Sequence, residues 1–289
     1  MLSVVTRASA NLDKPPQIVR RQAARLPWAW DGLVFAVPFN SADYLGLRDV
    51  VNEVGPSVVS NVAWTRDNRG NIACTLSASA YLEYADHPRH DTPTNELTVY
   101  ARFMRVGAGD VWGGIFVNVW GVGSPYTTWG LDDNAAGDGH INATVVAPTS
   151  GDFHQSADTG TVMSSTEYMS AFIRWRTVNA HTLHVLGERG QAVVNVTDDE
   201  VTTGPLLYAA GKPIRINGTE HDPPDSFNAK YSQCMVWKRR LGDAEMAALV
   251  ADPYGWCSPR RETISVAAPF PVGPGFASSL MQFIGPTQS

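Results

Sequence analysis

Paired carboxylates are the first chemistry to test in this sequence, because hydrolysis of a glycosidic bond needs two of them about 5–10 Å apart. The nearest acidic groupings are Glu83-Tyr-Ala-Asp86, Glu188 and Asp198-Asp199-Glu200. Side chains alternate between the faces of a strand, and none of these groupings sets two glutamates on one strand at the needed spacing. A serine-hydrolase G-x-S-x-G turn is also missing, since Gly121-Val-Gly-Ser-Pro125 lacks the last glycine. The sequence therefore predicts that the protein is not an enzyme.

Oxygen ligands for a metal ion gather at Asp132-Asp133-Asn134 and Asp138. Such hard oxygens suit Ca²⁺, but the segment lacks the glutamate that closes an EF-hand loop, and Asp, Asn and Gly together are also typical of a plain turn. His181 and His184 would point to opposite faces of a strand, which argues against joint ligation. We expect no cofactor, with Ca²⁺ at Asp132, Asp133 and Asp138 as the alternative.

Four aromatic residues gather around one glycine-rich stretch: Trp112, Trp120, Tyr126 and Trp129. Exposed aromatic rings can stack on the faces of sugars, so these residues are candidates for binding a glycan. The competing interpretation places them in the core, where aromatic side chains bury a large apolar area. The sequence favours the core and leaves the glycan-binding role open.

Short β-rich runs must position these residues. From Trp28 to about Pro253 such runs are separated by Gly, Pro, Asn and Asp, as in an all-β sandwich or barrel. In the run 96–103, Leu97, Val99, Ala101 and Phe103 share one face and Thr98, Tyr100 and Arg102 the other, which predicts a half-buried strand. Further strands are expected at 33–39, 112–120, 126–131, 140–146, 169–175, 182–187, 191–196, 213–217 and 227–237. A single amphipathic helix is expected at 243–251.

The overall composition limits the class of protein. The chain has 289 residues, 44% of them hydrophobic, and a formal net charge of −6, so it offers no long-range attraction to nucleic acid. No apolar run approaches the roughly 20 residues of a membrane span, and the N-terminal residues lack an apolar signal core. Cys74, Cys234 and Cys257 are widely spaced and form no CxxC motif, which predicts free thiols, with a single disulfide as the alternative.

Two terminal segments lack the periodic pattern of an independent domain. Residues 1–27, the N-terminal arm, are basic and interrupted by prolines, while residues 258–289, the C-terminal arm, combine prolines with apolar side chains. We expect residues 28–257 to form one domain and both arms to fasten it to neighbouring subunits. The residues assigned to this assembly role are Arg20, Arg21, Arg25, Phe270, Phe276, Leu280 and Phe283.

A family resemblance supports the all-β fold. The segment Phe227-Asn-Ala-Lys-Tyr-Ser-Gln-Cys-Met-Val-Trp-Lys-Arg-Arg-Leu241, followed by 242–255, resembles the closing strand and helix of laminin G-like domains. Segments 32–39, 81–84, 96–103 and 182–190 resemble earlier strands of that family in the right order. The resemblance implies a two-sheet antiparallel jelly roll of the concanavalin A-like kind. The chain departs from it at Ser232 and Gln233, where many relatives carry acidic residues.

The same resemblance suggests a function. A basic N-terminal arm and an apolar tail after Asp252-Pro-Tyr-Gly-Trp256 are similar to laminin G-like structural proteins of tailed bacteriophages. This implies a non-enzymatic virion protein, made in the host cytoplasm, that decorates the head or associates with the tail. Its partners would be capsid or tail subunits and further copies of itself, with host-surface glycans possible and nucleic acid and membrane insertion excluded. Two alternatives stay open: a glycan-binding adhesin, and a glycanase of the same fold.

Overall fold

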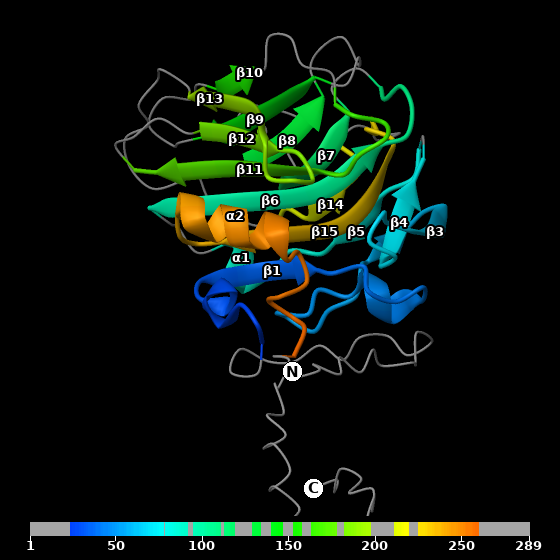
Figure 1. Ribbon diagram of the computed structural model, residues 1–289. Helices are drawn as coiled ribbons and strands as arrows, with labels where there is room; N and C mark the ends of the chain where they lie inside the picture. Colours follow the sequence, from blue (N-terminus) through cyan, green and yellow to red (C-terminus); the bar gives the residue numbers. More distant parts are fainter. Residues whose placement is uncertain are drawn as a thin grey trace, which may run out of the picture.

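The computed structural model describes residues 24–77, 79–91, 95–110, 113–118, 129–133, 140–146, 153–157, 163–177, 182–197, 211–219 and 225–259. Within these ranges, fifteen strands form two antiparallel sheets that pack face to face (Figure 1). The predicted all-β, two-sheet sandwich is confirmed. No helix in these ranges is long and apolar enough to cross a membrane.

The first sheet is built around two long central strands. Its order is β13-β12-β11-β6-β15-β4-β3, and β1 also pairs with β15. Its strands are β1 (Leu33–Val37), β3 (Val62–Arg66), β4 (Ile72–Leu76), β6 (Glu96–Arg105), β11 (Met169–Arg176), β12 (Thr182–Leu186), β13 (Ala192–Thr197) and β15 (Ala229–Trp237). One edge of β15 pairs with β6, and β1 and β4 share the other edge. The last strand of the chain therefore lies in the middle of the sheet.

The second sheet has shorter strands. Its order is β10-β9-β8-β7-β14-β5-β2. Its strands are β2 (Val58–Val59), β5 (Leu82–Tyr84), β7 (Gly114–Asn118), β8 (Trp129–Asp133), β9 (Ile141–Val146), β10 (Phe153–Ala157) and β14 (Ile214–Ile216). β14 comes late in the chain but pairs between β7 and β5. In this sheet too, strands that are far apart in the sequence lie side by side.

The core between the two sheets follows from strand alternation. In β6, Leu97, Val99, Ala101 and Phe103 all face this core, as their period of two requires. Strands of the second sheet supply the opposite side, including Phe116, whose ring packs 5.7 Å from that of Phe35. This inter-sheet core holds the sandwich together by burying apolar surface.

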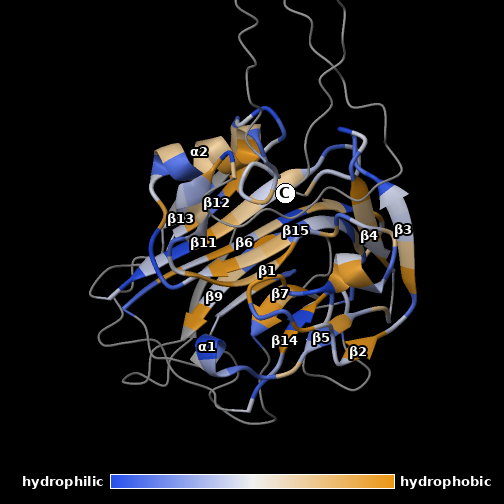
Figure 2. Cartoon of the chain, turned by 90° about the horizontal axis from the view of Figure 1, so that it is seen from below, coloured by the Kyte–Doolittle hydropathy of each residue, from blue (hydrophilic) through white to orange (hydrophobic). Residues whose placement is uncertain are grey.

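The prediction that β6 is half-buried is wrong, because its other face is buried too. Tyr100 stacks on Phe172 at a ring separation of 4.6 Å, and both belong to a second hydrophobic cluster on the outer side of the first sheet. We call this the outer cluster. The helix α2 (Asp243–Ala251) lies against this face of the first sheet (Figure 2). The short helix η2 (Pro27–Trp30) and residues 254–257 contribute further side chains to the outer cluster and complete its burial.

The predicted helix at 243–251 is confirmed as α2. Glu245 reaches back to accept a hydrogen bond from the Gly242 N–H at 2.8 Å, which caps the first turn. Leu249 is fully buried in the outer cluster, so the helix packs on the sheet through its apolar side. Two further short helices were not expected: α1 (Pro88–Asp91) and η3 (Tyr44–Leu47).

The two ends of the described chain pair with each other. Ala24 forms an antiparallel bridge with Pro259, the Arg25 N–H donates to the Ser258 carbonyl at 3.1 Å, and the Arg25 guanidinium contacts the Asp252 carboxylate at 2.7 Å. Both ends therefore leave the domain side by side (Figure 1). We call this pairing the terminal clasp. It crosses the expected domain limits at 27/28 and 257/258, and it places Arg25 on the domain itself.

The three cysteines are free, as predicted. Cys74 and Cys234 lie in strands β4 and β15, and Cys257 follows α2 in the outer cluster. Burial raises the pKa of the Cys257 thiol to about 12. The thiols are therefore protonated and shielded at neutral pH, which makes them poor nucleophiles.

Candidate functional site

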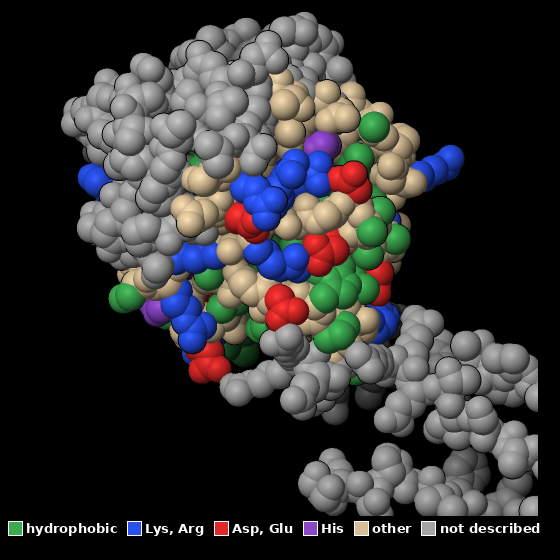
Figure 3. Space-filling view, turned by 90° about the vertical axis from the view of Figure 1, so that its left-hand side faces the viewer, with side chains coloured by type: hydrophobic (Ala, Val, Ile, Leu, Met, Phe, Trp, Pro, Cys, Tyr) green, Lys and Arg blue, Asp and Glu red, His purple; other side chains and the backbone are tan. Residues whose placement is uncertain are grey.

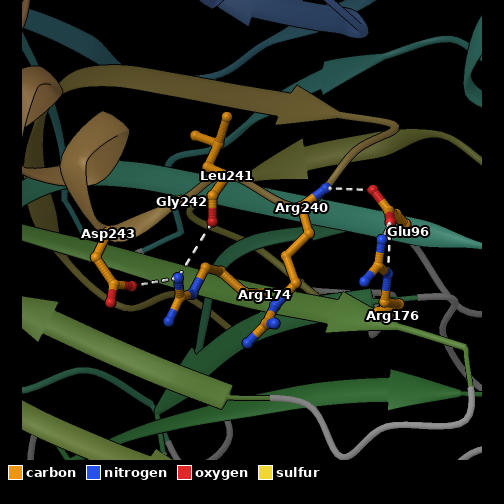
Figure 4. A pocket seen from close by; sticks show the side chains of 7 residues that line it. All are labelled: Glu96, Arg174, Arg176, Arg240, Leu241, Gly242 and Asp243. Atoms are coloured by element: carbon orange, nitrogen blue, oxygen red, sulfur yellow. Dashed lines mark hydrogen bonds and ion pairs between the residues drawn. The ribbon is translucent and has the colours of Figure 1, made fainter.

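A cavity of about 380 Å³ opens where β6, β11 and the β15–α2 connection meet (Figure 4). We call it the arginine pocket, because its lining residues are Glu96, Arg174, Arg176, Arg240, Leu241, Gly242 and Asp243. On the side of the molecule where β11 ends and α2 begins, basic and acidic side chains are intermingled (Figure 3). The pocket therefore offers charge, and little apolar surface, to a ligand.

Strand geometry brings the first three charged side chains together. Arg174 and Arg176 are two residues apart in β11, so both point to the outer face of the sheet. Antiparallel pairing sets Arg176 opposite Glu96 of β6. These side chains share one edge of the pocket because of register alone, without any loop to position them.

The fourth charged side chain, Arg240, comes from the turn after β15. Thr98 fixes this turn in two ways: its hydroxyl donates to the Arg239 carbonyl at 2.8 Å and accepts from the Leu241 N–H at 2.9 Å. The turn then delivers Gly242 and the start of α2 to the far side of the pocket. A buried threonine on β6 therefore holds Arg240 over the sheet.

Arg174 is committed to structural contacts. Its guanidinium donates to Asp243 Oδ1 at 2.5 Å and to the Leu241 carbonyl at 3.1 Å, and it lies 2.8 Å from His184 Nε2. Burial, and then the charge of Arg174, lowers the pKa of His184 to about 4. The imidazole is therefore neutral at physiological pH, so its Nε2 can accept a hydrogen bond from the arginine.

Arg176 is also partnered. Its Nε donates to Glu96 Oε1 at 2.6 Å, and the Arg240 backbone N–H donates to Glu96 Oε2 at 3.1 Å. Burial alone would raise the pKa of Glu96, but these hydrogen bonds outweigh it and hold the pKa below its usual value. Glu96 is therefore ionised at neutral pH and compensates one of the three guanidinium charges.

Arg240 differs from both, because its guanidinium has no hydrogen bond or ion pair within the described part of the chain (Figure 4). The pKa of Arg240 is lowered, mainly by burial and further by the neighbouring positive charges of Arg174 and Arg176. Three guanidinium groups face two carboxylates in this pocket, so one positive charge is left over. An anionic group placed beside Arg240 would compensate that charge.

The predicted calcium ligands lie in a different sheet. Asp132 and Asp133 are consecutive residues of β8, not of a turn, so their side chains point to opposite faces. Both are buried, and the Thr144 hydroxyl lies 3.4 Å from Asp132 Oδ2. Asp138 lies outside the described residues. Across the residues that the structure does describe, no three His, Cys, Asp or Glu side chains come close enough to share a metal ion.

Of the four candidate aromatic residues, the structure describes one. Trp129 is buried in the inter-sheet core, where its ring meets Phe116 edge-on at 5.1 Å. This residue follows the core interpretation and is not available to stack on a sugar. Trp112, Trp120 and Tyr126 lie outside the described residues, as do Arg20, Arg21, Phe270, Phe276, Leu280 and Phe283.

Two of the glutamates considered for hydrolysis have structural partners, while Asp198, Asp199 and Glu200 lie outside the described residues. Glu83 of β5 pairs with Arg215 at 2.8 Å, while Glu188, after β12, contacts Arg69 at 3.1 Å and Arg102 at 2.9 Å. The two glutamates belong to different sheets and do not form a pair on one strand. Their arrangement gives no support to a glycosidase.

The residues that depart from the laminin G-like pattern are also structural. Ser232 accepts a hydrogen bond from Arg102 at 2.8 Å, and Gln233 Nε2 donates to the Pro253 carbonyl at 2.6 Å. Both side chains are buried, so each satisfies a polar group beneath the outer cluster. They have no direct access to a ligand in solution.

Sequence reasoning missed the arginine pocket. Its signal was an Arg-x-Arg pair at strand spacing, Arg174 and Arg176, together with the run Lys238-Arg239-Arg240 before the helix. The two signals are about 60 residues apart, and only the pairing of β11 and β15 with β6 brings them to one place. Arg239 of the same run faces away from the pocket and pairs with Glu245 at 2.9 Å.

Comparison with known proteins identifies the fold but not a family. No protein-family model matches the sequence, and no curated protein matches it. Among solved structures, the binding domain of Paraclostridial Mosquitocidal Protein 1 superposes with a TM-score of 0.57 at 15% identity, over 79% of this chain and 55% of that one.

Two further solved structures are similar. A structure concerned with the dependence of botulinum neurotoxin type C cell entry on two ganglioside molecules gives a TM-score of 0.54 at 8% identity, over 76% of this chain and 50% of that one. A Trypanosoma rangeli sialidase mutant with trans-sialidase activity gives 0.55 at 12% identity, over 81% and 34%. The chain thus spans about half the length of each toxin chain and a third of the sialidase chain, and identities this low establish the β-sandwich fold alone.

Proposed function

We propose that the protein is a non-catalytic glycan-binding module and that the arginine pocket holds an acidic group of the glycan, a carboxylate or a sulfate. The observation that carries this proposal is the guanidinium of Arg240, which lies beside two other arginines without a partner of its own in the described chain. A planar guanidinium can hold a carboxylate or sulfate with two parallel hydrogen bonds, which fixes its orientation as well as its charge.

The start of α2 adds to this chemistry. A helix N-terminus carries a partial positive charge and favours an anion, and Gly242 and Asp243 line the pocket at that end of the helix. Asp243 is 85% exposed at its side chain, so a competing anion can displace it from Arg174 at little cost in desolvation. A ligand on Arg240 could thus take the place of Asp243 on the Arg174 guanidinium, which would keep its contacts with the Leu241 carbonyl and His184.

The similar proteins support a glycan as the partner. One of the three similar structures concerns neurotoxin entry that depends on two ganglioside molecules, and another is a sialidase. Gangliosides carry sialic acid, which is a carboxylated sugar. By analogy with those proteins, we propose a sialylated, uronate-containing or sulfated glycan for this chain.

The virion role remains a prediction. It rests on the two arms, most of whose residues lie outside the described ranges, and the three similar structures described above do not concern a bacteriophage particle. A glycan-binding sandwich could also serve on the surface of a particle, so the two roles do not exclude each other. The absence of catalysis is likewise a proposal, to be checked by reducing-sugar release from any glycan that binds.

Binding to an array of neutral, carboxylated and sulfated glycans tests the proposal. We expect retention of acidic glycans only, and an Arg240→Ala variant should bind about 10- to 100-fold more weakly, as for loss of a hydrogen bond between charged groups. Arg189→Ala is the matched control, because it removes the same charge from the exposed turn between β12 and β13. Equal losses in both variants, or equal binding of neutral glycans, would contradict the proposal.

A further inference from the structure

A second hollow, of about 920 Å³, lies between η2 and β1 on one side and residues 45–53 on the other. Five of its lining residues are apolar: Trp30, Leu33, Leu45, Val50 and Val51. We call it the tryptophan groove. It is separate from the arginine pocket, with which it shares no residue.

Exposed apolar side chains are concentrated in the segment that forms one wall of the groove. Leu45 is 62% exposed, Tyr44 56% and Val54 41%, so three of the five large exposed hydrophobic side chains in the described residues fall within 11 positions. Of these three, Leu45 lines the groove, together with the apolar residues of the opposite wall. Single exposed hydrophobic residues are common, but one that continues an apolar groove is typical of a docking surface.

The other five lining residues are polar: Arg48, Asn52, Glu53, His87 and Arg89. Three of them donate to backbone carbonyl groups of the protein itself: Arg48 to Glu53, Arg89 to Val51 at 3.3 Å, and Asn52 Nδ2 to Val34 at 2.8 Å. The five apolar side chains are therefore the part of the groove that an apolar, uncharged occupant would cover.

The C-terminal side of the chain starts next to this groove. The ring of Trp30 packs 5.5 Å from that of Trp256, and Trp30 Nε1 donates to the Trp256 carbonyl at 2.6 Å. Pro259, held in the terminal clasp, is three residues further along. An extended chain covers about 3.3 Å per residue, so the 11 residues from Pro259 to Phe270 can span roughly 36 Å.

The sequence beyond this point has the required composition. No charged side chain occurs between Thr263 and Ser289, and the segment contains Phe270, Phe276 and Phe283. We propose that residues 266–284 of the same chain bind in the tryptophan groove. A short tether gives the segment an effective concentration in the millimolar range, which favours it over a free partner.

Accessibility of a thiol at the rim tests this proposal on the full-length protein. In a Leu45→Cys variant, we expect maleimide to modify the introduced thiol several-fold more slowly than in the same variant with Phe270→Ser, Phe276→Ser and Phe283→Ser added. Background modification should be low, because all three native cysteines are buried. Circular dichroism of both proteins checks that the sandwich stays folded.

A matched control places the thiol far from the groove. Leu33 of the groove pairs with Trp237, which in turn pairs with Thr98 near the start of β6. Val106 is also exposed but follows the other end of β6, about 26 Å from Thr98 at 3.3 Å per residue, so a Val106→Cys thiol should react equally with and without the three serines. The expected protection of the thiol at position 45 is independent of protein concentration. Equal reactivity of that thiol in both backgrounds would overturn the proposal, and so would protection that grows with concentration, since it would identify a second copy as the occupant.

The outcome is independent of the glycan experiment. The tryptophan groove can accept the chain's own segment whether or not the arginine pocket binds an acidic sugar, because the two sites have no lining residue in common. Failure of one proposal therefore leaves the other standing.

Discussion

The two hydrophobic clusters on either side of the first sheet are built in different ways. The inter-sheet core consists largely of strand residues whose side chains alternate inward, such as Val99 and Phe103 of β6. The outer cluster is completed by residues that are not in strands, including Ala29, Leu249 and Trp256. Within the outer cluster, Trp237 of β15 joins the strand residues to those outside strands, since its Nε1 donates to the Ala29 carbonyl at 2.6 Å. A sheet can thus be buried on both faces even when only one face meets another sheet.

Because both clusters bury large apolar side chains, we expect the outer cluster to stabilise the fold as much as the inter-sheet core does. We expect Leu249→Ala to lower the free energy of unfolding by about 2–5 kcal/mol, in the same range as Phe103→Ala at about 3–5 kcal/mol. Both side chains are fully buried and each leaves a cavity when truncated. Chemical denaturation of the two variants measures the effects. A loss below about 0.5 kcal/mol for Leu249→Ala, the range of a surface substitution, would show that the outer cluster is peripheral.

A buried ion pair supplies polar contacts beneath the outer cluster. Arg102 projects from β6 beneath the outer cluster, contacting Asp67 at 3.0 Å and Glu188 at 2.9 Å. Arg102→Ala leaves the fully buried Asp67 carboxylate without its cation, so we expect a loss of about 3–5 kcal/mol. An Arg102→Ala/Asp67→Ala double variant should recover part of this loss, as measured by denaturation. No recovery would mean that Arg102 acts by packing alone.

Acid should weaken the region around the arginine pocket. The pKa of His184 is lowered to about 4 by burial and then by Arg174, against an ordinary value of 6.5. The unfolded chain therefore binds more protons between these values, so this contribution is fully present above pH 6.5 and is lost as the pH falls toward 4. A His184→Gln variant should show a shallower decline in melting temperature over that window. An unchanged slope would assign the acid sensitivity elsewhere, for example to His90, whose pKa is also lowered to about 4 by burial and then by His87.

The smallest effect is expected at the terminal clasp. The ion pair of Arg25 with Asp252 is about one third exposed, and such pairs contribute about 0–1 kcal/mol. Arg25→Ala should therefore change the unfolding free energy by less than about 1 kcal/mol in low salt, and by less still in high salt. A larger loss would show that the clasp, and not only the apolar contacts behind it, keeps the outer cluster closed.

The parts predicted from sequence share a local signal. Alternation over eight residues identified β6 and β11, and the spacing of Met246, Leu249 and Val250 together with Pro253 set the limits of α2. Strands β2, β3, β4 and β10 were missed, because their runs are very short or, as in Val-Ala-Trp-Thr-Arg66, mix polar and apolar residues without clear alternation. These segments are strands because neighbouring strands pair with them, although their own sequences carry no clear strand pattern.

The candidate site was harder to predict, because its residues have no shared local pattern. Arg174 and Arg240 look like ordinary surface arginines in the sequence, and their proximity depends on which strands β6 pairs with. The sequence instead drew attention to Asp132 and Asp133, whose adjacency looked like a turn but continues strand β8. In this chain, the adjacent aspartates did not form a site, whereas the arginines that line one pocket are far apart in the sequence.

The terminal clasp also determines how the domain responds to mechanical force. Because the two antiparallel ends leave at one point, a load applied to them opens the backbone hydrogen bonds at Arg25 and Leu26 one after another, as a zipper does. The force reaches β1 and β15 only after the clasp has parted. A domain tethered through both ends would thus lengthen in a soft first step and meet strong resistance only when the sheet itself is loaded.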